Sequence, residues 1–249
     1  MTLLILSVFL LSGCGAAPRL PDNKTVASTG LRTGGNMDSN ITLLPTLDYI
    51  PVLKIDKKGR PIPYRPAQNP YLKGSTRVSR EATDAYQRAK QAFIIHDFEG
   101  AQQQLHYLLN NNARLSGPWV MLGDISLKQN ALEQAAAHYL QAIAINKRNI
   151  NAYLRLAKVQ RMQGKFLRAQ NTYAKSLAIW ADFPEAHLNL GILYDLYLND
   201  PVMAQKHIEA YQFLTGGKNT EVAAWLRDLQ KRTAEVDGDQ QVGKTIPIS

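Results

Sequence analysis

The side chain with the clearest nucleophilic chemistry is Cys14, the only cysteine among 249 residues. It follows an apolar stretch, Leu3–Leu11, that is interrupted only by Ser7, and then two small residues, Ser12 and Gly13. Small side chains leave the backbone accessible, and a thiolate is a strong nucleophile. The apolar stretch is far shorter than the ~20 residues that span a bilayer, so no transmembrane helix is expected here.

This N-terminal pattern resembles a bacterial lipoprotein signal peptide with its lipobox. The resemblance implies that residues 1–13 are removed and that Cys14 carries a diacylglyceryl lipid, with palmitate among the acyl chains. Gly15, rather than Asp, follows the cysteine, which implies the periplasmic face of the outer membrane. The alternative is a lone buried or disordered cysteine after an ordinary secretory signal. No Lys or Arg precedes the apolar stretch, so the true start codon stays open.

The rest of the chain offers little catalytic chemistry. With Cys14 lipidated, no thiol is left for a disulfide, a redox pair or a thiolate metal site. Motifs of zinc proteases, serine hydrolases and phosphate-binding loops are absent from the sequence. The five histidines and two carboxylates form no pair at the spacing of metal ligands or of a catalytic acid and base. These residues are His96, His106, His138, His187, His207, Asp124 and Glu133. We therefore predict a protein that is not an enzyme, with no cofactor and no metal.

Positive charge is concentrated in the segment that follows Cys14. The net charge of the chain is +9, and residues 15–80 contribute 11 Lys and Arg against 4 Asp, which is +7. The same segment holds 8 of the 12 prolines, and proline excludes long helices and central strands. We predict that residues 14–80 form a lipidated, basic, Pro-rich linker that is mostly disordered or extended.

Two parts of this linker have more specific patterns. Thr46–Ile55 is apolar enough to dock on a folded surface, and Asp56–Gly59 has the residues of a turn, which favours a short hairpin or a strand along the folded domain. Five basic residues here could attract anionic lipid or another acidic envelope polymer, or could only keep a linker solvated; they are Lys54, Lys57, Lys58, Arg60 and Arg65. Nucleic acid is not an expected partner.

From Glu81 onward the sequence repeats itself every 34 residues, a period that indicates a helical repeat protein. Small residues recur where two helices must approach closely, at Gly123, Ala157 and Gly191. Large residues recur where the interface is filled, and His187 takes the position of Trp119 and Tyr153, which predicts a packing role for it. The repeated positions are Ala101, Ala135 and Ala169; Leu105, Tyr139 and Tyr173; Phe98, Leu132 and Phe166; and Leu122, Leu156 and Leu190.

This pattern resembles the tetratricopeptide repeat (TPR), whose W-x2-L-G signature is present as Trp119, Leu122 and Gly123. The resemblance implies an all-α fold, a right-handed superhelix of about four helix-turn-helix repeats. We expect a TPR domain at 81–217 with repeats near 82–115, 116–149, 150–183 and 184–217, and a one-residue insertion in the fourth turn. A capping helix at 218–236 and a disordered tail at 237–249 complete the prediction.

In TPR proteins the first helix of each repeat lines a concave groove, so the resemblance also predicts which side chains meet a ligand. Arg155, Lys158 and Arg161 fall on one broad face of the third first helix, and Asn189 matches a position where the family often uses Asn to hold a peptide backbone. The predicted protein-binding residues are Tyr86, Lys90, Leu154, Arg155, Lys158, Arg161, Leu188 and Asn189. Further candidates are Phe93, Val120, Asp124, Leu127 and Asp195. The alternative for each is a solvated helix face.

Two functional hypotheses follow. The first is a membrane-anchored, non-enzymatic adaptor that binds a peptide or helix, acidic or carboxylate-bearing, with one apolar anchor. It would serve an envelope complex for secretion, pilus formation, outer-membrane assembly or energy transduction. The second is a structural envelope scaffold that acts through its basic linker or through contacts between copies. The Lys and Asn set of the family's chaperone-tail clamp is not reproduced, so that ligand is not implied.

Overall fold

The structure is a computed structural model that describes residues 41–73 and 78–242. All of these belong to one unit of the chain, Met37–Ser249. The predicted signal peptide, Cys14 and the end of the predicted tail lie outside the described residues. Within the described part, none of the helices has the length and apolar character needed to cross a membrane.

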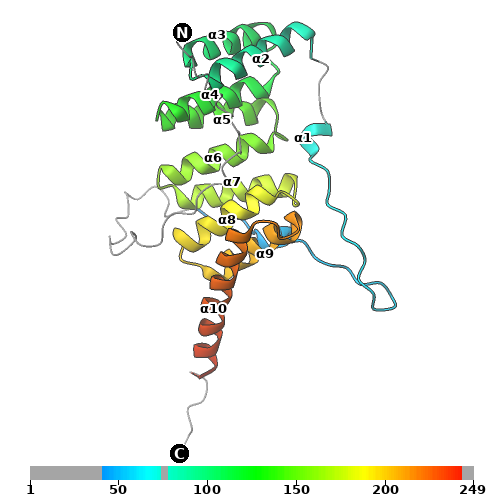
Figure 1. Ribbon diagram of the computed structural model, residues 1–249. Helices are drawn as coiled ribbons and strands as arrows, with labels where there is room; N and C mark the ends of the chain where they lie inside the picture. The colour runs from blue at the N-terminus through cyan, green and yellow to red at the C-terminus, as the bar shows by residue number, and fades with distance from the viewer. Residues whose placement is uncertain (1–40, 74–77, 243–249) are drawn as a thin grey trace, which may run out of the picture. The chain divides into compact units, whose positions relative to one another are not determined.

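Four antiparallel helix pairs form a stack in which each pair contacts the next (Figure 1). The 34-residue period therefore predicted the all-helical repeat fold correctly. The pairs are α2 (Arg80–Ile94) with α3 (Phe98–Asn111), α4 (Ser116–Lys128) with α5 (Leu132–Ile145), α6 (Ile150–Met162) with α7 (Phe166–Ile179), and α8 (Pro184–Leu196) with α9 (Pro201–Thr215).

The turn inside each repeat requires one residue in the left-handed conformation. That residue is His96, Asn130, Gly164 and Asn199 in the four repeats, with φ of 63°, 60°, 74° and 51°. The first three are 34 residues apart and the last is 35 residues further on, so the predicted one-residue insertion in the fourth turn is confirmed. Left-handed backbone suits Gly and is tolerated by Asn, which explains three of the four residues.

Close helix packing explains the small residues of the repeat. A Cβ atom on Gly123 would lie 2.3 Å from the ring of Tyr139, and one on Gly191 would lie 2.4 Å from Ile208. Tyr139 and Ile208 are fully buried, so each occupies the space that the glycine leaves free. Apolar side chains of neighbouring repeats then merge into continuous clusters, which is how a solenoid gains stability from stacking.

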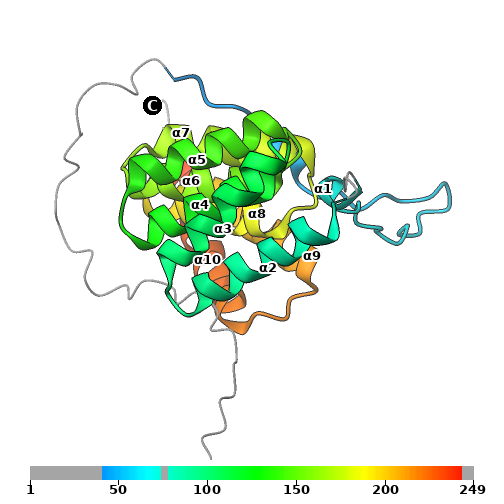
Figure 2. The same ribbon diagram turned by 90° about the horizontal axis from the view of Figure 1, so that it is seen from above.

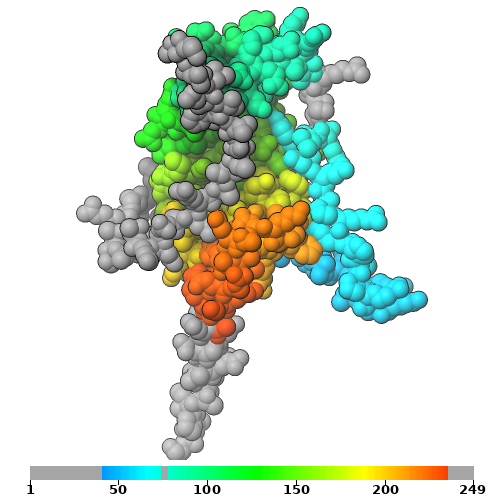
Figure 3. Space-filling model, in the orientation of Figure 1, coloured from blue at the N-terminus to red at the C-terminus, as the bar shows by residue number. Residues whose placement is uncertain are grey.

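Residues 41–73, which we call the strap, lie along one edge of the repeats (Figures 1 and 3). The helical elements of the strap are a 3₁₀ turn, η1 (Leu47–Tyr49), and one helical turn, α1 (Pro70–Lys73). Its hydrogen bonds begin at α7, α8 and α9 with residues 42–46 and end at Ser116 and Asn149 with Tyr71. The strap is therefore extended along repeats two to four, with its first contacts on repeats three and four and its last contacts at repeat two and the start of repeat three.

Only part of the segment Thr46–Ile55, which the sequence predicted to dock, contacts the repeats. Thr46 is buried and Tyr49 packs on the core, but Val52, Leu53 and Ile55 are exposed. The predicted turn is present, because the Gly59 N–H donates to the Asp56 carbonyl at 3.0 Å and Gly59 has φ of 76°. Hydrogen bonds and the rings of Tyr49, Tyr64 and Tyr71, rather than a continuous apolar run, hold the strap.

The last helix, α10 (Thr220–Val242), packs on α9. It continues beyond residue 236, where we expected the capping helix to end and a disordered tail to begin. No proline interrupts residues 237–242, so the helical hydrogen-bond pattern can continue there. The linker and tail boundaries remain predictions.

Candidate protein-binding site

The first helices of the repeats, α2, α4, α6 and α8, form what we call the first-helix face. On this face α4 contacts α6, and α6 contacts α8. In a TPR superhelix this side is the concave binding surface. The structure therefore brings the predicted binding residues of different repeats onto one surface.

Asp124 on α4 links three helices of the stack through its carboxylate. Its carboxylate accepts two hydrogen bonds from Arg155 Nε, at 2.8 and 3.1 Å, and one from the Tyr139 hydroxyl at 2.7 Å. Burial and the Asp124 charge together raise the pKa of Tyr139, so its hydroxyl stays protonated and donates. Arg155 therefore bridges repeats two and three, and its charge is already paired.

The Arg161 guanidinium also has a partner within the protein, Tyr197. It donates to the Tyr197 hydroxyl at 2.9 Å and lies 5.2 Å from the centre of the Tyr197 ring. Lys158, one turn away, is exposed, and none of the ion pairs among residues 41–73 and 78–242 includes it. The predicted cluster of three cations thus contains two cations with internal contacts and one, Lys158, that is directed to solvent.

Apolar and amide groups flank Lys158. Leu154 and Leu188 are half-buried and pack against the core of repeats three and four, so each exposes part of its side chain. Asn189 donates from its side-chain amide to the Glu185 carbonyl of its own helix at 2.7 Å. This bond uses one of the two amide protons and fixes the side chain, which leaves its other groups available to a backbone.

Repeat one contributes differently from prediction. Lys90 is exposed, whereas Tyr86 is half-buried in a cavity of about 370 Å³ that Tyr71 of the strap and Ser116 also line. Burial raises the pKa of Tyr86, and the nearby Tyr71 and Asp124 raise it further. The strap therefore reaches the edge of the first-helix face, a contribution that sequence reasoning missed.

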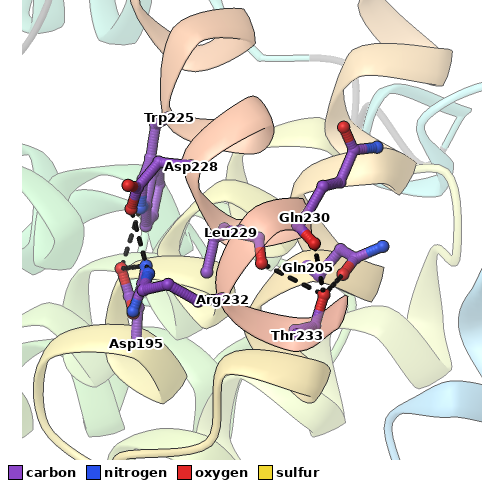
Figure 4. Close-up of polar contacts among 8 residues, drawn as sticks. All are labelled: Asp195, Gln205, Trp225, Asp228, Leu229, Gln230, Arg232 and Thr233. Carbon is purple, nitrogen blue, oxygen red and sulfur yellow. Dashed lines mark hydrogen bonds and ion pairs between the residues drawn. The ribbon is translucent and has the colours of Figure 1, made fainter. Parts of the chain in front are cut away.

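Asp195 is not available to a ligand, because α10 uses it (Figure 4). Its carboxylate accepts hydrogen bonds from the Trp225 indole at 2.8 Å and from Arg232 at 2.8 and 3.1 Å. Its side chain is only 6% exposed. The candidate role of Asp195 as a groove residue is therefore wrong, and this carboxylate instead fixes the capping helix on repeat four.

His187 is fully buried, as its predicted packing role requires, but it also belongs to a polar chain. Its Nε2 donates to the Ala181 carbonyl at 2.9 Å, so in the neutral ring its Nδ1 must accept from His207 Nδ1, 3.0 Å away. His207 Nε2 then accepts from the Thr46 hydroxyl at 2.9 Å. Burial lowers the pKa of His187, and burial with His187 nearby lowers that of His207 to about 3.

Every hydrogen bond in this chain is donated in the same direction, from Gln170 toward the Ala181 carbonyl. Thr46, after donating to His207, accepts from the Tyr194 hydroxyl at 3.3 Å, and Tyr194 accepts from Gln170 at 3.1 Å. Each donor matches one acceptor only when both histidines are neutral, so the network anchors the strap in that state. In the described part of the chain, no group of three or more His, Cys, Asp or Glu could hold a metal ion.

Comparison with known proteins identifies the fold. A family model described as TPR repeat matches residues 123–164. The matched residues are thus a tetratricopeptide repeat, as the sequence pattern predicted. A sequence comparison with curated proteins finds no match.

Three solved structures illustrate the likeness. A tetratricopeptide repeat protein from Parabacteroides merdae has a TM-score of 0.54 at 18% identity over 66% of this chain and 64% of its own. MamA from Desulfovibrio magneticus RS-1 has a TM-score of 0.53 at 12% identity, covering 66% of this chain and 91% of its own. A chain of the APC/C hetero-tetramer Cut9-Hcn1 has 0.51 at 13% identity, covering 59% of this chain and 30% of its own. These likenesses concern the fold alone.

Proposed function

We propose that this protein is a membrane-anchored, non-enzymatic adaptor that binds a protein partner through its first-helix face. The partner segment is a peptide or helix with an acidic side chain or a terminal carboxylate and one apolar anchor. The adaptor serves the assembly or operation of an envelope complex. One observation carries the proposal: Lys158 is directed to solvent between two cations that are held in place and beside the half-buried Leu154 and Leu188.

The electrostatics favour this kind of partner. Arg155 is fixed by Asp124 and Arg161 by Tyr197, so both contribute to the local potential without losing further conformational freedom on binding. Lys158 is then the free cation that can pair directly with a carboxylate. Leu154 and Leu188 offer apolar surface at the same place, which would bury one side chain of the partner.

Lipid anchoring at Cys14 is the second part of the proposal, and it rests on the sequence pattern alone. A diacylglyceryl group with a further acyl chain makes attachment durable, because each buried CH₂ contributes about 0.8 kcal/mol. The anchor would hold the first-helix face at the periplasmic surface of the outer membrane. The APC/C hetero-tetramer Cut9-Hcn1 is a precedent, at the level of fold, for such a repeat in a multi-protein assembly.

The test is photocrosslinking in cells. A photoreactive residue replaces Lys158, and a second strain carries it at Lys175, an exposed lysine of the second helix α7. We expect a dominant protein adduct from position 158 that is absent from position 175 and is lost when Leu188 is changed to Glu. Equal adducts from both positions, or adducts that persist in Leu188→Glu, would reject the first-helix face as the binding surface.

The anchor is tested separately by Cys14→Ser in the full chain. The unmodified protein should fractionate with membranes and incorporate labelled palmitate, and the variant should do neither. If the variant still incorporates palmitate, the proposed lipidation site is wrong, whatever the outcome of the crosslinking.

A further inference from the structure

The strap carries a preformed hairpin that none of the helices covers. We call residues 52–62 the strap hairpin. Its two arms are joined by a bridge between Ile55 and Pro61, with the Ile62 N–H donating to the Lys54 carbonyl at 2.8 Å. The hairpin projects away from the helices in both ribbon views (Figures 1 and 2). It is therefore a defined shape rather than an open loop.

The Asp56 carboxylate holds the turn of this hairpin. It accepts the backbone N–H groups of Lys58 at 2.8 Å and Arg60 at 2.9 Å, and the Arg60 guanidinium also binds it at 2.8 Å. The backbone hydrogen bond from Arg60 lowers the pKa of Asp56, so the carboxylate stays ionised. The one acidic group of the hairpin is thus used internally.

Large apolar side chains are unusually exposed on the hairpin. The exposed fraction is 70% for Val52, 56% for Leu53, 66% for Ile55 and 44% for Ile62. The strap's contacts with the repeats are made by other residues, among them Thr46, Tyr64 and Tyr71. An apolar cluster that is exposed on an ordered element marks an interaction surface.

The same segment is strongly basic. Lys54, Lys57, Lys58, Arg60 and Arg65 give five positive charges against the single charge of Asp56, a net +4 over residues 52–65. Aliphatic side chains among lysines and arginines are the composition of surfaces that lie in the membrane interface, where apolar groups enter the acyl boundary and cations meet phosphate headgroups.

We propose that the strap hairpin binds the surface of an anionic bilayer, with Val52, Leu53, Ile55 and Ile62 at the acyl boundary and its lysines among the headgroup phosphates. Each cation near such a surface raises affinity about fivefold. Each aliphatic side chain that leaves water adds about tenfold. This surface is separate from the first-helix face, so the inference stands or falls independently of the adaptor proposal.

The experiment uses the full chain with Cys14→Ser, so that lipid on the protein does not contribute. A cysteine introduced at Val52 carries an environment-sensitive dye, and a matched protein carries it at the exposed Gln103 of α3. With phosphatidylcholine vesicles that contain phosphatidylglycerol, the dye at position 52 should move to an apolar environment and the dye at 103 should not. Pure phosphatidylcholine vesicles should give little change.

Charge variants distinguish membrane binding by the hairpin from a general effect of net charge on vesicle affinity. Lys57→Glu with Lys58→Glu should lower vesicle affinity by about 30-fold or more, because two favourable charges are lost. The control, Lys128→Glu with Lys231→Glu, makes the same change in net charge at exposed sites on α4 and α10 and should retain most of the affinity. Circular dichroism and melting should be the same in all variants.

Three results would overturn the proposal. One is vesicle binding with the dye at position 52 still in water, which would assign binding to another segment, such as residues 3–11. Another is an equal loss of affinity in the two double variants. The third is the absence of vesicle binding together with a specific protein crosslink from position 52, which would make the hairpin a protein-docking site instead.

Discussion

The repeats and the strap belong to one fold but are held by different kinds of interaction. The repeats are held by apolar side chains that interlock at fixed intervals, as Tyr139 does over Gly123. The strap is held by isolated polar anchors: Thr46 on His207, Tyr64 and Ala67 on Asp182, and Tyr71 on Ser116. Packing distributes the stability of the repeats over many contacts, whereas the strap depends on a few hydrogen bonds and tyrosine contacts that can each be removed.

The largest effect is expected from filling the space beneath Tyr139. Gly123→Ala places a Cβ 2.3 Å from the Tyr139 ring, and we expect a loss of about 3 kcal/mol in the free energy of unfolding because the buried ring cannot move freely. The control is Gly117→Ala on the same helix, where the new Cβ would meet Tyr86 only at 3.9 Å. Urea denaturation measures both, and equal effects would show that packing at Gly123 is not the cause.

The pH dependence of the free energy of unfolding tests whether the neutral His187 and His207 anchor the strap. His187 and His207 have pKa values below the ordinary 6.5 in the folded state, with that of His207 at about 3. Above pH 6.5 both rings are neutral in both states and the contribution is complete. As the pH falls below 6.5, the unfolded chain binds protons that the folded chain does not, so stability decreases, by about 2 kcal/mol at pH 5 for His207 alone.

Urea denaturation at pH 7 and pH 5 tests this expectation. His207→Gln should flatten the pH dependence, while His106→Gln, a change at an exposed histidine, should leave it as it is. If the unchanged protein has the same stability at both pH values, the neutral-histidine network does not anchor the fold.

A smaller effect that is confined to the strap is expected from Thr46→Val. The variant keeps the shape of the side chain but leaves His207 Nε2 without its donor, at a cost of about 1–2 kcal/mol. Hydrogen exchange should accelerate in residues 41–73 while the helices of repeats one and two remain protected. Thr42→Val, at an exposed threonine, is the matched control. Equal acceleration throughout the repeats would mean that the strap and the repeats are one cooperative unit.

The smallest effect concerns the turns. Asn130→Gly should stabilise by about 0.5 kcal/mol, because φ at this position is 60° and glycine adopts it without strain. Gln129→Gly, at the preceding residue with φ of −84°, should destabilise instead. Thermal melting of both variants checks the sign, and a loss of stability in Asn130→Gly would show that the asparagine side chain contributes more than its backbone strain costs.

The same contrast explains what the sequence could predict. Periodic positions such as Gly123, Ala157 and Gly191 depend only on spacing along the chain, so the repeats and the fourth-turn insertion were predictable. The partners of Thr46 lie up to 161 residues away and follow no period. A single Thr carries no signal of such an anchor, and the pairings of Arg155 with Asp124 and of Asp195 with Arg232 were equally invisible.

The strap contacts repeats three and four first and repeat two last, before the chain enters α2. Tension applied to the chain ahead of residue 41 therefore reaches the contacts of Leu44 and Thr46 first and loads the helices only after the strap has peeled away. Peeling would release roughly 110 Å of extended chain at 3.3–3.6 Å per residue over residues 41–73. We therefore expect the strap to detach first under load and to lengthen the connection while the repeats stay folded.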